Sequence, residues 1–426
     1  MTWDEEPVRV RVPATSANLG PGFDALGLAL SLYDEVEARV APSGLHIDVS
    51  GEGAADVTDA EEAHLIVRAM RTAFDDLGSG QPPGIALRCV NRIPHGRGLG
   101  SSAAAIVAGV LAARALAGAG TGPDEALPLA NALEGHPDNV APCLYGGLTI
   151  AWLSESPPGT ARAVRLEPAA GITPVAIIAA DPVSTGVARG LLPARVPHAD
   201  AALNAGRAAL LVAALTACPE ALLDATEDRL HQDYRAQAMP DTRDLVGRLR
   251  AAGVPAVVSG AGPSVLAFLT SGSCGHGLDR MDSIVKETGK EWRISPLDVE
   301  RQGASVAPGA ECPVNLDKSS PGRLPLFPRH GWLRRNAVGA VGVRLDAALD
   351  VPLRGRCWSS TRRLGGNVYL PREWAFGFTP GEHRVPLSAT PFDSVATEAS
   401  AGGCGHGRRR GPGVDAEHRC ERNHAQ

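Results

Sequence analysis

A glycine- and serine-rich segment, Pro94–Ala104, is the part of the sequence best suited to chemistry. It reads PHGRGLGSSAA, and a long run of Ala, Val, Ile and Leu follows at once. Glycines let a backbone approach a ligand closely, and successive N–H groups at a helix N-terminus form a cradle for phosphate oxygens. Ser101 and Ser102 add hydroxyls that can bind phosphate or a metal ion. The same residues also suit an ordinary strand-to-helix turn that is capped by serine.

A second glycine loop, Ser259–Ser264 (SGAGPS), lies between two short apolar runs. Alone, such a loop is also typical of an ordinary turn, but two of them in one chain are less easily explained that way. The lysines of the chain lie far from both loops, at Lys286, Lys290 and Lys318. A Walker A site needs a lysine inside its glycine loop, so that class of nucleotide site is excluded.

Two further loops supply carboxylates and amides. Thr15–Asp24 (TSANLGPGFD) suits a loop that folds over a polar small molecule. Its last residue, Asp24, can accept a hydrogen bond from a substrate hydroxyl, or else cap a following helix. In Glu134–Asn139 (EGHPDN), Glu134 offers the hard oxygen ligand that Mg²⁺ prefers. His136 and Asp138 also fit a turn in which the two side chains bond to each other.

In this order and spacing, the four loops resemble the superfamily of galactokinase, homoserine kinase, mevalonate kinase and phosphomevalonate kinase. Pro94–Ala104 is similar to the nucleotide-phosphate motif of that superfamily, and Ser259–Ser264 to its third motif. The segments that resemble homoserine kinases specifically are Thr15–Asp24, Glu134–Asn139, Ser184–Arg189 (STGVAR) and His231–Arg235 (HQDYR). The resemblance covers roughly residues 8–306. Such kinases commonly carry asparagine where His64 aligns, near the nucleotide base, which leaves the base contact open.

The resemblance implies an enzyme that uses ATP and Mg²⁺ to phosphorylate the side-chain hydroxyl of L-homoserine, a step of threonine biosynthesis. It implies that Ser102 and Glu134 bind the metal and that Asp24 orients the hydroxyl, so these three are the catalytic candidates. The residues expected around homoserine are Asn18, Asp24, His136, Asn139, Arg189 and Arg235. Those expected on ATP are Pro94, His95, Gly96, Arg97, Gly98, Leu99, Gly100, Ser101, Ser102, Ala103, Ala104, Gly260 and Gly262.

These residue types are physically sensible for an amino-acid substrate. A carboxylate needs cations, and arginine supplies planar bidentate donors. The ammonium and hydroxyl groups need acceptors, which Asp24 and the asparagines provide. Without the resemblance, Arg189 and Arg235 would be interpreted as surface or ion-paired arginines. The alternatives are another kinase of the superfamily, acting on mevalonate or shikimate, and a non-catalytic member that only binds its ligand.

Both strands and helices are predicted to position these loops. Strands are predicted at Val8–Val12, Ile85–Val90, Gly146–Trp152, Val175–Ala180, Ala256–Val258 and Val265–Phe268, with Val36–Val40 and Leu45–Val49 as antiparallel strands. Helices are predicted at Ala63–Leu77, Ala103–Ala117, Pro123–Leu133, Leu203–Ala217, Leu222–Leu230 and Thr242–Ala252. Ala103–Ala117 is apolar all round, which is typical of a helix buried inside a domain.

We therefore expect an α+β fold, and the resemblance implies a two-domain small-molecule kinase. Residues 8–165 would form the N-terminal nucleotide-loop domain, and residues 166–306 a C-terminal domain like a ferredoxin-like sandwich. Residues 307–426 are rich in Pro, Gly and Arg and show no sustained apolar period. We expect this tail to be disordered or outside the kinase fold. A shifted reading frame in GC-rich DNA would produce such a sequence, and an appended domain is the alternative.

Composition excludes several other classes. The net charge of -6 over 426 residues gives no reason to expect nucleic acid as a partner. No apolar run reaches the roughly 18 residues that span a bilayer, and the N-terminus lacks a secretory pattern, so we expect a cytoplasmic protein without a membrane segment. The eight cysteines form no CxxC pair, which gives no signal for a zinc or thioredoxin-type site. The resemblance favours a homodimer.

Overall fold

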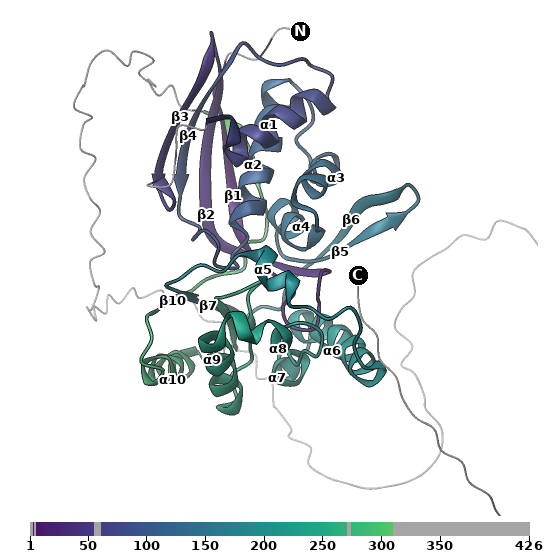
Figure 1. Ribbon diagram of the computed structural model, residues 1–426, viewed down its shortest axis with the longest axis vertical. Helices are drawn as coiled ribbons and strands as arrows, with labels where there is room; N and C mark the ends of the chain where they lie inside the picture. The colour runs from purple at the N-terminus through teal and green to yellow at the C-terminus, as the bar shows by residue number, and fades with distance from the viewer. Residues whose placement is uncertain (1–2, 4–5, 55–60, 271–273, 310–426) are drawn as a thin grey trace, which may run out of the picture. The chain divides into compact units, whose positions relative to one another are not determined.

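The computed structural model describes Trp3 and residues 6–54, 61–270 and 274–309 (Figure 1). The chain divides into two compact units, Met1–Phe327 and Pro328–Gln426, and every described residue belongs to the first. The predicted tail therefore lies outside the described residues, apart from its first three positions. Within the described ranges, no helix is both long and apolar enough to cross a membrane.

A mixed sheet forms the first layer of the fold. In the described residues it has seven strands, in the order β11-β1-β2-β4-β3, with β5 paired to β2 and β6 paired to β5. Their bounds are Val8–Ala17 (β1), Leu26–Ala41 (β2), Gly44–Gly51 (β3), Gly84–Asn91 (β4), Leu148–Glu155 (β5), Pro158–Leu166 (β6) and Ser305–Pro308 (β11). The inward side chains Val8, Val10 and Val12 of β1 alternate with exposed Arg9 and Arg11, as a half-buried strand requires.

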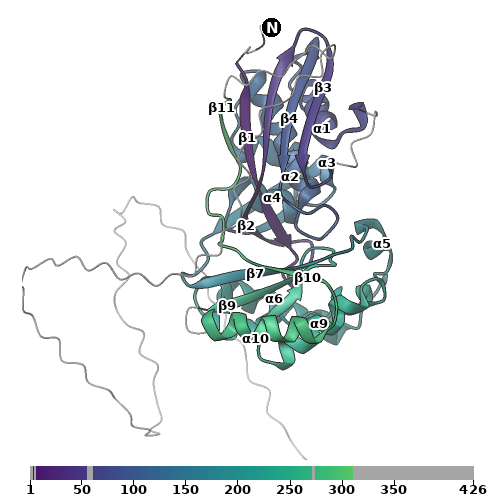
Figure 2. The same ribbon diagram turned by 90° about the vertical axis from the view of Figure 1, so that its left-hand side faces the viewer.

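Four helices cover one face of this sheet, as the two ribbon views show (Figures 1 and 2). They are α1 (Leu65–Asp76), α2 (Ser101–Leu116), α3 (Pro123–Glu134) and α4 (Pro137–Tyr145), with the short 3₁₀ helix η2 (Glu61–Ala63) before α1. Helix α2 is buried nearly all round, as its composition predicted. Its Gly109 lies so close to α1 that a Cβ atom there would stand 2.6 Å from the Ile66 carbonyl oxygen. The small residues of α2 thus let this helix pack closely against α1, while its first residues, Ser101 and Ser102, stay half-buried and exposed, respectively.

The second layer is a smaller sheet with the order β10-β7-β9-β8, antiparallel throughout. Its strands are β7 (Ile172–Ala179), β8 (Ala256–Val258), β9 (Val265–Thr270) and β10 (Trp292–Pro296). A run of helices joins β7 to β8, and α10 joins β9 to β10, which gives the β-α-β-β-α-β order of ferredoxin-like folds. The predicted fold class is confirmed. The helices of this layer are α5 (Thr185–Gly190), α6 (His198–Thr216), α7 (Leu222–Ala225), α8 (Gln232–Arg235), α9 (Pro240–Ala251), α10 (Cys274–Glu287) and the 3₁₀ turns η3 (Pro219–Ala221) and η4 (Ala236–Ala238).

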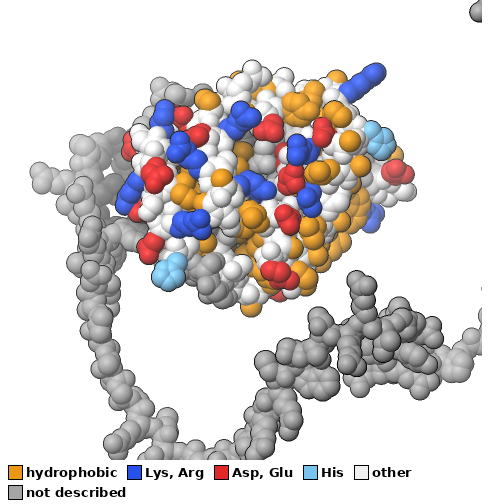
Figure 3. Space-filling model, turned by 90° about the horizontal axis from the view of Figure 1, so that it is seen from below, with side chains coloured by type: hydrophobic (Ala, Val, Ile, Leu, Met, Phe, Trp, Pro, Cys, Tyr) orange, Lys and Arg blue, Asp and Glu red, His pale blue; other side chains and the backbone are white. Residues whose placement is uncertain are grey.

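The face of the second layer seen from below carries interspersed acidic and basic side chains (Figure 3). This layer also carries exposed ion pairs, such as the one between Arg248 and Asp244, which lie 2.7 Å apart within α9. Because charges of both signs alternate along α9, this helix presents a solvated outer face and buries Leu245 and Leu249 against the sheet.

Three sequence predictions differ from the structure. The segments 36–40 and 45–49 do not pair with each other, because β4 lies between β2 and β3 and pairs with both. The helix predicted from Leu222 to Leu230 ends at Ala225, because the Asp228 carboxylate accepts the N–H groups of residues 230–232 and so starts a new turn. A domain boundary at residue 306 falls inside β11, which pairs with β1 up to Pro308.

Candidate active site

The two glycine loops pack directly against each other. Gly98 has φ +72°, and a Cβ atom there would lie 2.1 Å from the Ser259 carbonyl oxygen. The Ser259 hydroxyl donates to the Gly98 carbonyl oxygen at 2.6 Å. Gly100, with φ +70°, is the N-cap residue of α2, whose first residue is Ser101. The chain therefore presents backbone N–H groups at a partly exposed helix N-terminus, on glycines that carry no side chains.

A cavity of about 130 Å³ opens beside these loops. It gathers residues from each segment that the sequence analysis singled out: Asn18, Gly96, Gly98, Gly100, Ser101, Ser102, Glu134, His136, Asp138, Asn139, Arg189, Arg235 and Gly260. Thr185 and Ala261 also line it and were not predicted. Thr185 precedes Arg189 by one helical turn of α5, so the helical spacing within the Ser184–Arg189 segment would have found it.

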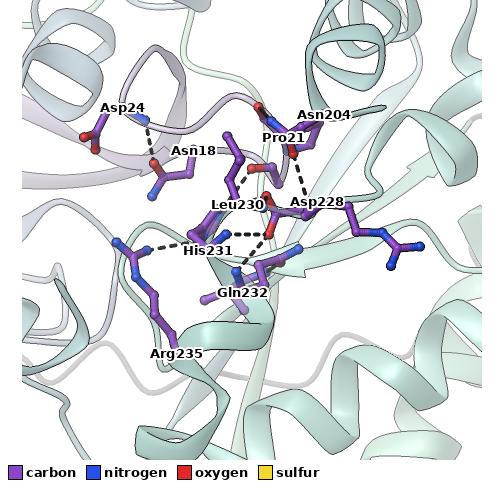
Figure 4. Close-up of polar contacts among 12 residues, drawn as sticks. Asn18, Pro21, Asp24, Asn204, Asp228, Leu230, His231, Gln232 and Arg235 are labelled. Atoms are coloured by element: carbon purple, nitrogen blue, oxygen red, sulfur yellow. Dashed lines mark hydrogen bonds and ion pairs between the residues drawn. The ribbon is translucent and has the colours of Figure 1, made fainter. Parts of the chain in front are cut away.

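Arg235 is the most unusual group of this cavity. Only 1% of it is exposed, and its Nη1 donates to His231 Nδ1 at 3.1 Å (Figure 4). Nη1 also donates to the Gly260 carbonyl oxygen at 3.3 Å. Its Nε is buried without a hydrogen-bond partner. Burial, and secondly the nearby Arg189, lower the pKa of this guanidinium. A buried cation with an unused donor is costly unless an anion joins it, so this position fits an anionic group of a ligand.

Asp24 and Arg189 form a bidentate ion pair. Arg189 Nη2 lies 2.7 Å from Asp24 Oδ1, and Nη1 lies 3.1 Å from Oδ2. Both side chains are a little over one third exposed. The hydrogen bond to Asp24 raises the pKa of Arg189. A ligand that carries both an ammonium and a carboxylate matches this pair, because each of its charges can take one partner.

Asn18 holds the loop rather than offering a free amide. Its Nδ2 donates to the Gly260 carbonyl oxygen at 2.8 Å, and its Oδ1 accepts the backbone N–H of Asp24 at 2.9 Å. Asn18 lines the cavity, but both of its polar functions are used within the protein. It thereby ties the segment 15–24 to the second glycine loop.

Ser102 and Glu134 meet at the start of α2 and the end of α3. The Ser102 hydroxyl donates to Glu134 Oε2 at 2.7 Å. Burial is the main cause that raises the pKa of the Glu134 carboxyl, which the Ser102 hydrogen bond partly offsets. A divalent cation would supply the positive charge that this buried carboxylate lacks. In the part of the chain that the structure describes, no three His, Cys, Asp or Glu side chains group around a metal position. Two protein oxygens beside a phosphate cradle fit Mg²⁺, which commonly takes its other ligands from phosphates and water.

His136 and Asp138 bond to each other, as expected if they form a turn. His136 Nδ1 lies 2.7 Å from Asp138 Oδ1, and this bond raises the pKa of His136. Asn139 Oδ1 accepts the Thr15 hydroxyl at 2.9 Å. The loop 134–139 is therefore braced internally while its side chains still line the cavity.

A second, larger cavity of about 420 Å³ adjoins the start of α2. It shares Ser101 and Ser102 with the first cavity, and its walls are mainly the aliphatic side chains Val12, Val36, Ile47, Val49, Leu65, Ile66, Ala104, Ala105 and Ala108. His64 and His95 also line it. The Nδ1 atom of His64 is buried without a partner, and burial lowers the pKa of this ring. Apolar walls with an unused polar atom suit a flat heterocycle.

Some predicted ATP residues lie elsewhere. Pro94 and Arg97 line a separate cavity of about 210 Å³, and Arg97 donates to the carbonyl oxygens of Ala179 and Ala180. Leu99 and Ala103 are buried in the main core. A Cβ atom on Gly262 would lie 2.4 Å from the Met239 sulfur. These residues shape the loops but line neither the 130 Å³ cavity nor the 420 Å³ cavity.

Comparisons with known proteins show which family the chain resembles. Residues 64–147 match the family model described as GHMP kinases N terminal domain. The chain is 59% identical over 304 residues to a homoserine kinase of Streptomyces coelicolor, covering 71% of this chain and 94% of that one. It is 50% identical to a homoserine kinase of Clavibacter michiganensis, over 70% of this chain and 93% of that one.

Solved structures with a similar fold include a homoserine kinase and a mevalonate kinase. The crystal structure of homoserine kinase from Cytophaga hutchinsonii matches with a TM-score of 0.62 and 28% identity, over 72% of this chain and 99% of that one. Mevalonate kinase from L. major, at 17% identity and a TM-score of 0.52, covering 69% of this chain and 96% of that one, shares the fold. Because the chain covers nearly the whole length of relatives at up to 59% identity, it belongs to the homoserine kinase family of the GHMP kinases.

Proposed function

We propose that the chain transfers the γ-phosphoryl group of ATP to the side-chain hydroxyl of L-homoserine, giving O-phospho-L-homoserine. One observation carries this proposal: buried Arg235, with an unused donor, lies with the Asp24–Arg189 pair beside a glycine-lined helix N-terminus. Arg189 and Arg235 line the same cavity as the helix N-terminus, and Asp24 adjoins that cavity through its ion pair with Arg189. Mevalonate, shikimate and galactose lack an ammonium group and would leave Asp24 without its second partner.

In the proposed complex, Arg235 and Arg189 bind the homoserine carboxylate and Asp24 accepts from its ammonium or hydroxyl. His136 and Asn139 border the cavity and complete the polar surroundings. Arg235 is fixed by two contacts before any ligand arrives, so little side-chain entropy remains to be lost on binding. This preorganisation favours substrates that carry a carboxylate over substrates that lack one.

The nucleotide would lie across both cavities. Its base fits the apolar 420 Å³ cavity with His64, and its phosphates would accept from backbone N–H groups of the segment 96–102. Ser102 and Glu134 would hold Mg²⁺, which supplies charge neutralisation on the phosphates when bound. The Ser102–Glu134 hydrogen bond already places both oxygens on one side of the loop.

Catalysis by these residues is mainly positioning, because phosphoryl transfer leaves the protein little covalent work. The hydroxyl oxygen of homoserine forms the new bond to phosphorus and gives up its proton to water, while the bond to the ADP oxygen breaks. Asp24 orients that hydroxyl through a hydrogen bond. A carboxylate is a weak base toward an alcohol, so orientation is the main contribution of Asp24.

A coupled assay of ADP release across homoserine, mevalonate, shikimate and galactose tests the substrate. Turnover with homoserine alone is the expected result, and a preference for any of the other three would contradict it. We also propose that the enzyme works as a cytoplasmic homodimer in threonine biosynthesis. Restored growth of a threonine-requiring, homoserine kinase-deficient strain tests the pathway, and light scattering of the purified chain tests the dimer.

A further inference from the structure

His231 lies fully buried between the arginine of the cavity and the loop 15–24. Its Nε2 is 2.9 Å from the Gly20 carbonyl oxygen, and its Nδ1 is 3.1 Å from Arg235 Nη1 (Figure 4). A carbonyl oxygen can only accept and a guanidinium can only donate. The ring must therefore carry its proton on Nε2 and keep a lone pair on Nδ1. A neutral ring agrees with this geometry, because burial lowers the pKa of His231, an effect that Asp228 opposes and Arg235 reinforces.

Asp228 holds the backbone that carries this ring. The Asp228 carboxylate accepts the backbone N–H groups of Leu230, His231 and Gln232 at 2.8–3.1 Å, which starts helix α8 at this point. His231 Nε2 is 3.8 Å from Asp228 Oδ1, too far for a hydrogen bond, so the ring remains directed at Gly20. The ring also contacts Phe23, with 5.3 Å between centroids.

The loop that His231 contacts has a strained backbone. Asn18, Leu19 and Asp24 have φ values of +67°, +51° and +55°, and among the described residues no other non-glycine residue has a positive φ. Such conformations persist only where the surroundings impose them. The second layer supplies several such contacts, including those from His231 to the Gly20 carbonyl, from Asn204 to the Pro21 carbonyl at 2.8 Å, and between Asn18 and Gly260.

We propose that His231 is a positioning residue for the substrate, and this rests on the proposed function. As a neutral Nε2–H tautomer, it fixes the guanidinium of Arg235 with one nitrogen and the strained loop that carries Asp24 with the other. His231 thereby fixes the position of Arg235, which binds the substrate carboxylate, relative to Asp24, which orients the substrate hydroxyl. Nη1 of Arg235 is engaged by His231 and Gly260, so the substrate carboxylate meets the remaining donors, Nε and Nη2.

Two variants separate the two contacts. In His231→Asn, the side-chain oxygen can replace Nδ1 and still accept from Arg235, whereas the contact with Gly20 is lost. In His231→Gln, the amide nitrogen can replace Nε2 and still donate to Gly20, whereas Arg235 loses its acceptor. We expect His231→Gln to raise the KM for homoserine about tenfold with the KM for ATP unchanged. His231→Asn should lower kcat and leave the homoserine KM within about twofold of wild type.

The decarboxylated analogue, 3-aminopropan-1-ol, supplies the decisive comparison, because a contact that acts through Arg235 matters only when a carboxylate is bound. The KM penalty of His231→Gln should disappear with this analogue. An equal penalty for both substrates, or equal KM effects of the two variants, would overturn the proposal. Asp233→Asn is the control, since Asp233 is exposed on the same helix and pairs only weakly with Arg243 at 3.5 Å; it should change neither constant.

The tautomer can be read on the wild-type chain, whether or not the variants fold. Nitrogen-15 shifts of the His231 ring, assigned by difference from His231→Gln or Asn, should report an Nε2–H imidazole at pH 7.5. An Nδ1–H tautomer or an imidazolium would refute the positioning role. Failure of the wild-type chain to phosphorylate homoserine would instead refute the proposed function, and the ring nitrogens would still report the tautomer independently.

Discussion

Arg189 and Arg235 border the same cavity but meet different surroundings. Arg189 is partly exposed and already neutralised by Asp24, whereas Arg235 is buried and has no carboxylate partner at hydrogen-bonding distance among the described residues. Each raises the electrostatic cost of the other, which contributes to the lowered pKa of Arg235. An anion between them would lower the energy of both, so a carboxylate ligand gains more here than at an isolated surface arginine.

Replacing either arginine by alanine should therefore weaken homoserine binding, and Arg235→Ala should do so more. A lost charge-assisted contact costs roughly 1.5–3 kcal/mol, equivalent to about ten- to hundredfold in KM. The increase in homoserine KM for Arg189→Ala should be near the lower end of this range, because the substitution frees Asp24 to bind the ammonium group of homoserine. Steady-state kinetics with both substrates measure this, with Arg248→Ala on the exposed face of α9 as the control. Equal effects on the KM for ATP would contradict the assignment.

The oxygen pair at Ser102 and Glu134 gives a second test at this scale. Ser102→Ala and Glu134→Gln should each lower kcat sharply, and the concentration of Mg²⁺ needed for half-maximal rate should rise. Glu125→Gln, on the exposed side of the same helix α3, serves as the matched control. Near-normal turnover of Glu134→Gln at limiting Mg²⁺ would show that another group holds the metal.

Helices and strands with a clear apolar period were largely predictable. The ranges expected around α1, α2, α6, α9 and β4 differ from the structure by a few residues, since burial of one face fixes them locally. The predictions for β1 and β2 were too short, because β1 continues to Ala17 and β2 already begins at Leu26. The sequence analysis missed α4, α5, α8, α10, β6, β10 and β11. Helix α4 carries Pro137 and Pro142, which mask its pattern, and α5 is too short to show a period.

Pairing and hydrogen bonding between distant segments could not be read from local pattern. Placement of β4 between β2 and β3 depends on strands that are tens of residues apart in the chain. The same holds for the site, where the loops carrying Asn18, Glu134 and Arg235 were found from residue type. The contacts that hold them, from His231 to Gly20 and from Asn18 to Gly260, link positions more than 200 residues apart.

The close contact of the two glycine loops predicts a specific sensitivity. Gly98→Ala should lower the melting temperature and raise the KM for ATP, because its Cβ atom would meet the Ser259 carbonyl oxygen at 2.1 Å. Gly118→Ala is the matched control, since Gly118 has a similar φ of +67° with nothing within 4 Å of its Cβ position. The control should show only the left-handed penalty, about 1–2 kcal/mol. Equal losses in thermal melting would mean that the loop contact contributes nothing.

At the scale of the whole chain, the two layers share one main core. Leu211, Leu215 and Phe268 of the second layer pack in the same buried cluster as the strands and helices of the first. After β10, the chain returns to the first sheet, where the Ser31 N–H donates to the Asp298 carbonyl oxygen at 2.9 Å and β11 pairs with β1. The segment 297–309 therefore belongs to the first layer, although it follows the second in sequence.

This return strand locates the end of the kinase fold and gives the last prediction. A chain ending at Gly309 should keep the melting temperature and the kcat/KM for homoserine, because all described strands and both ligand cavities are formed by earlier residues. A chain ending at Ala304 should melt several degrees lower, since it loses β11, the hydrogen bonds of that strand to β1, and the Val306 side chain against the core.

Comparing the two truncations separates the tail from the strand. If the chain ending at Gly309 lost stability or activity, residues 310–426 would have to contribute to the kinase, and the appended-domain interpretation of the tail would gain support. If the chain ending at Ala304 behaved like the full-length protein, β1 would be stable as an edge strand without its partner. That outcome would conflict with the burial of Val8 and Val10, whose strand would then expose its unpaired N–H and C=O groups to solvent.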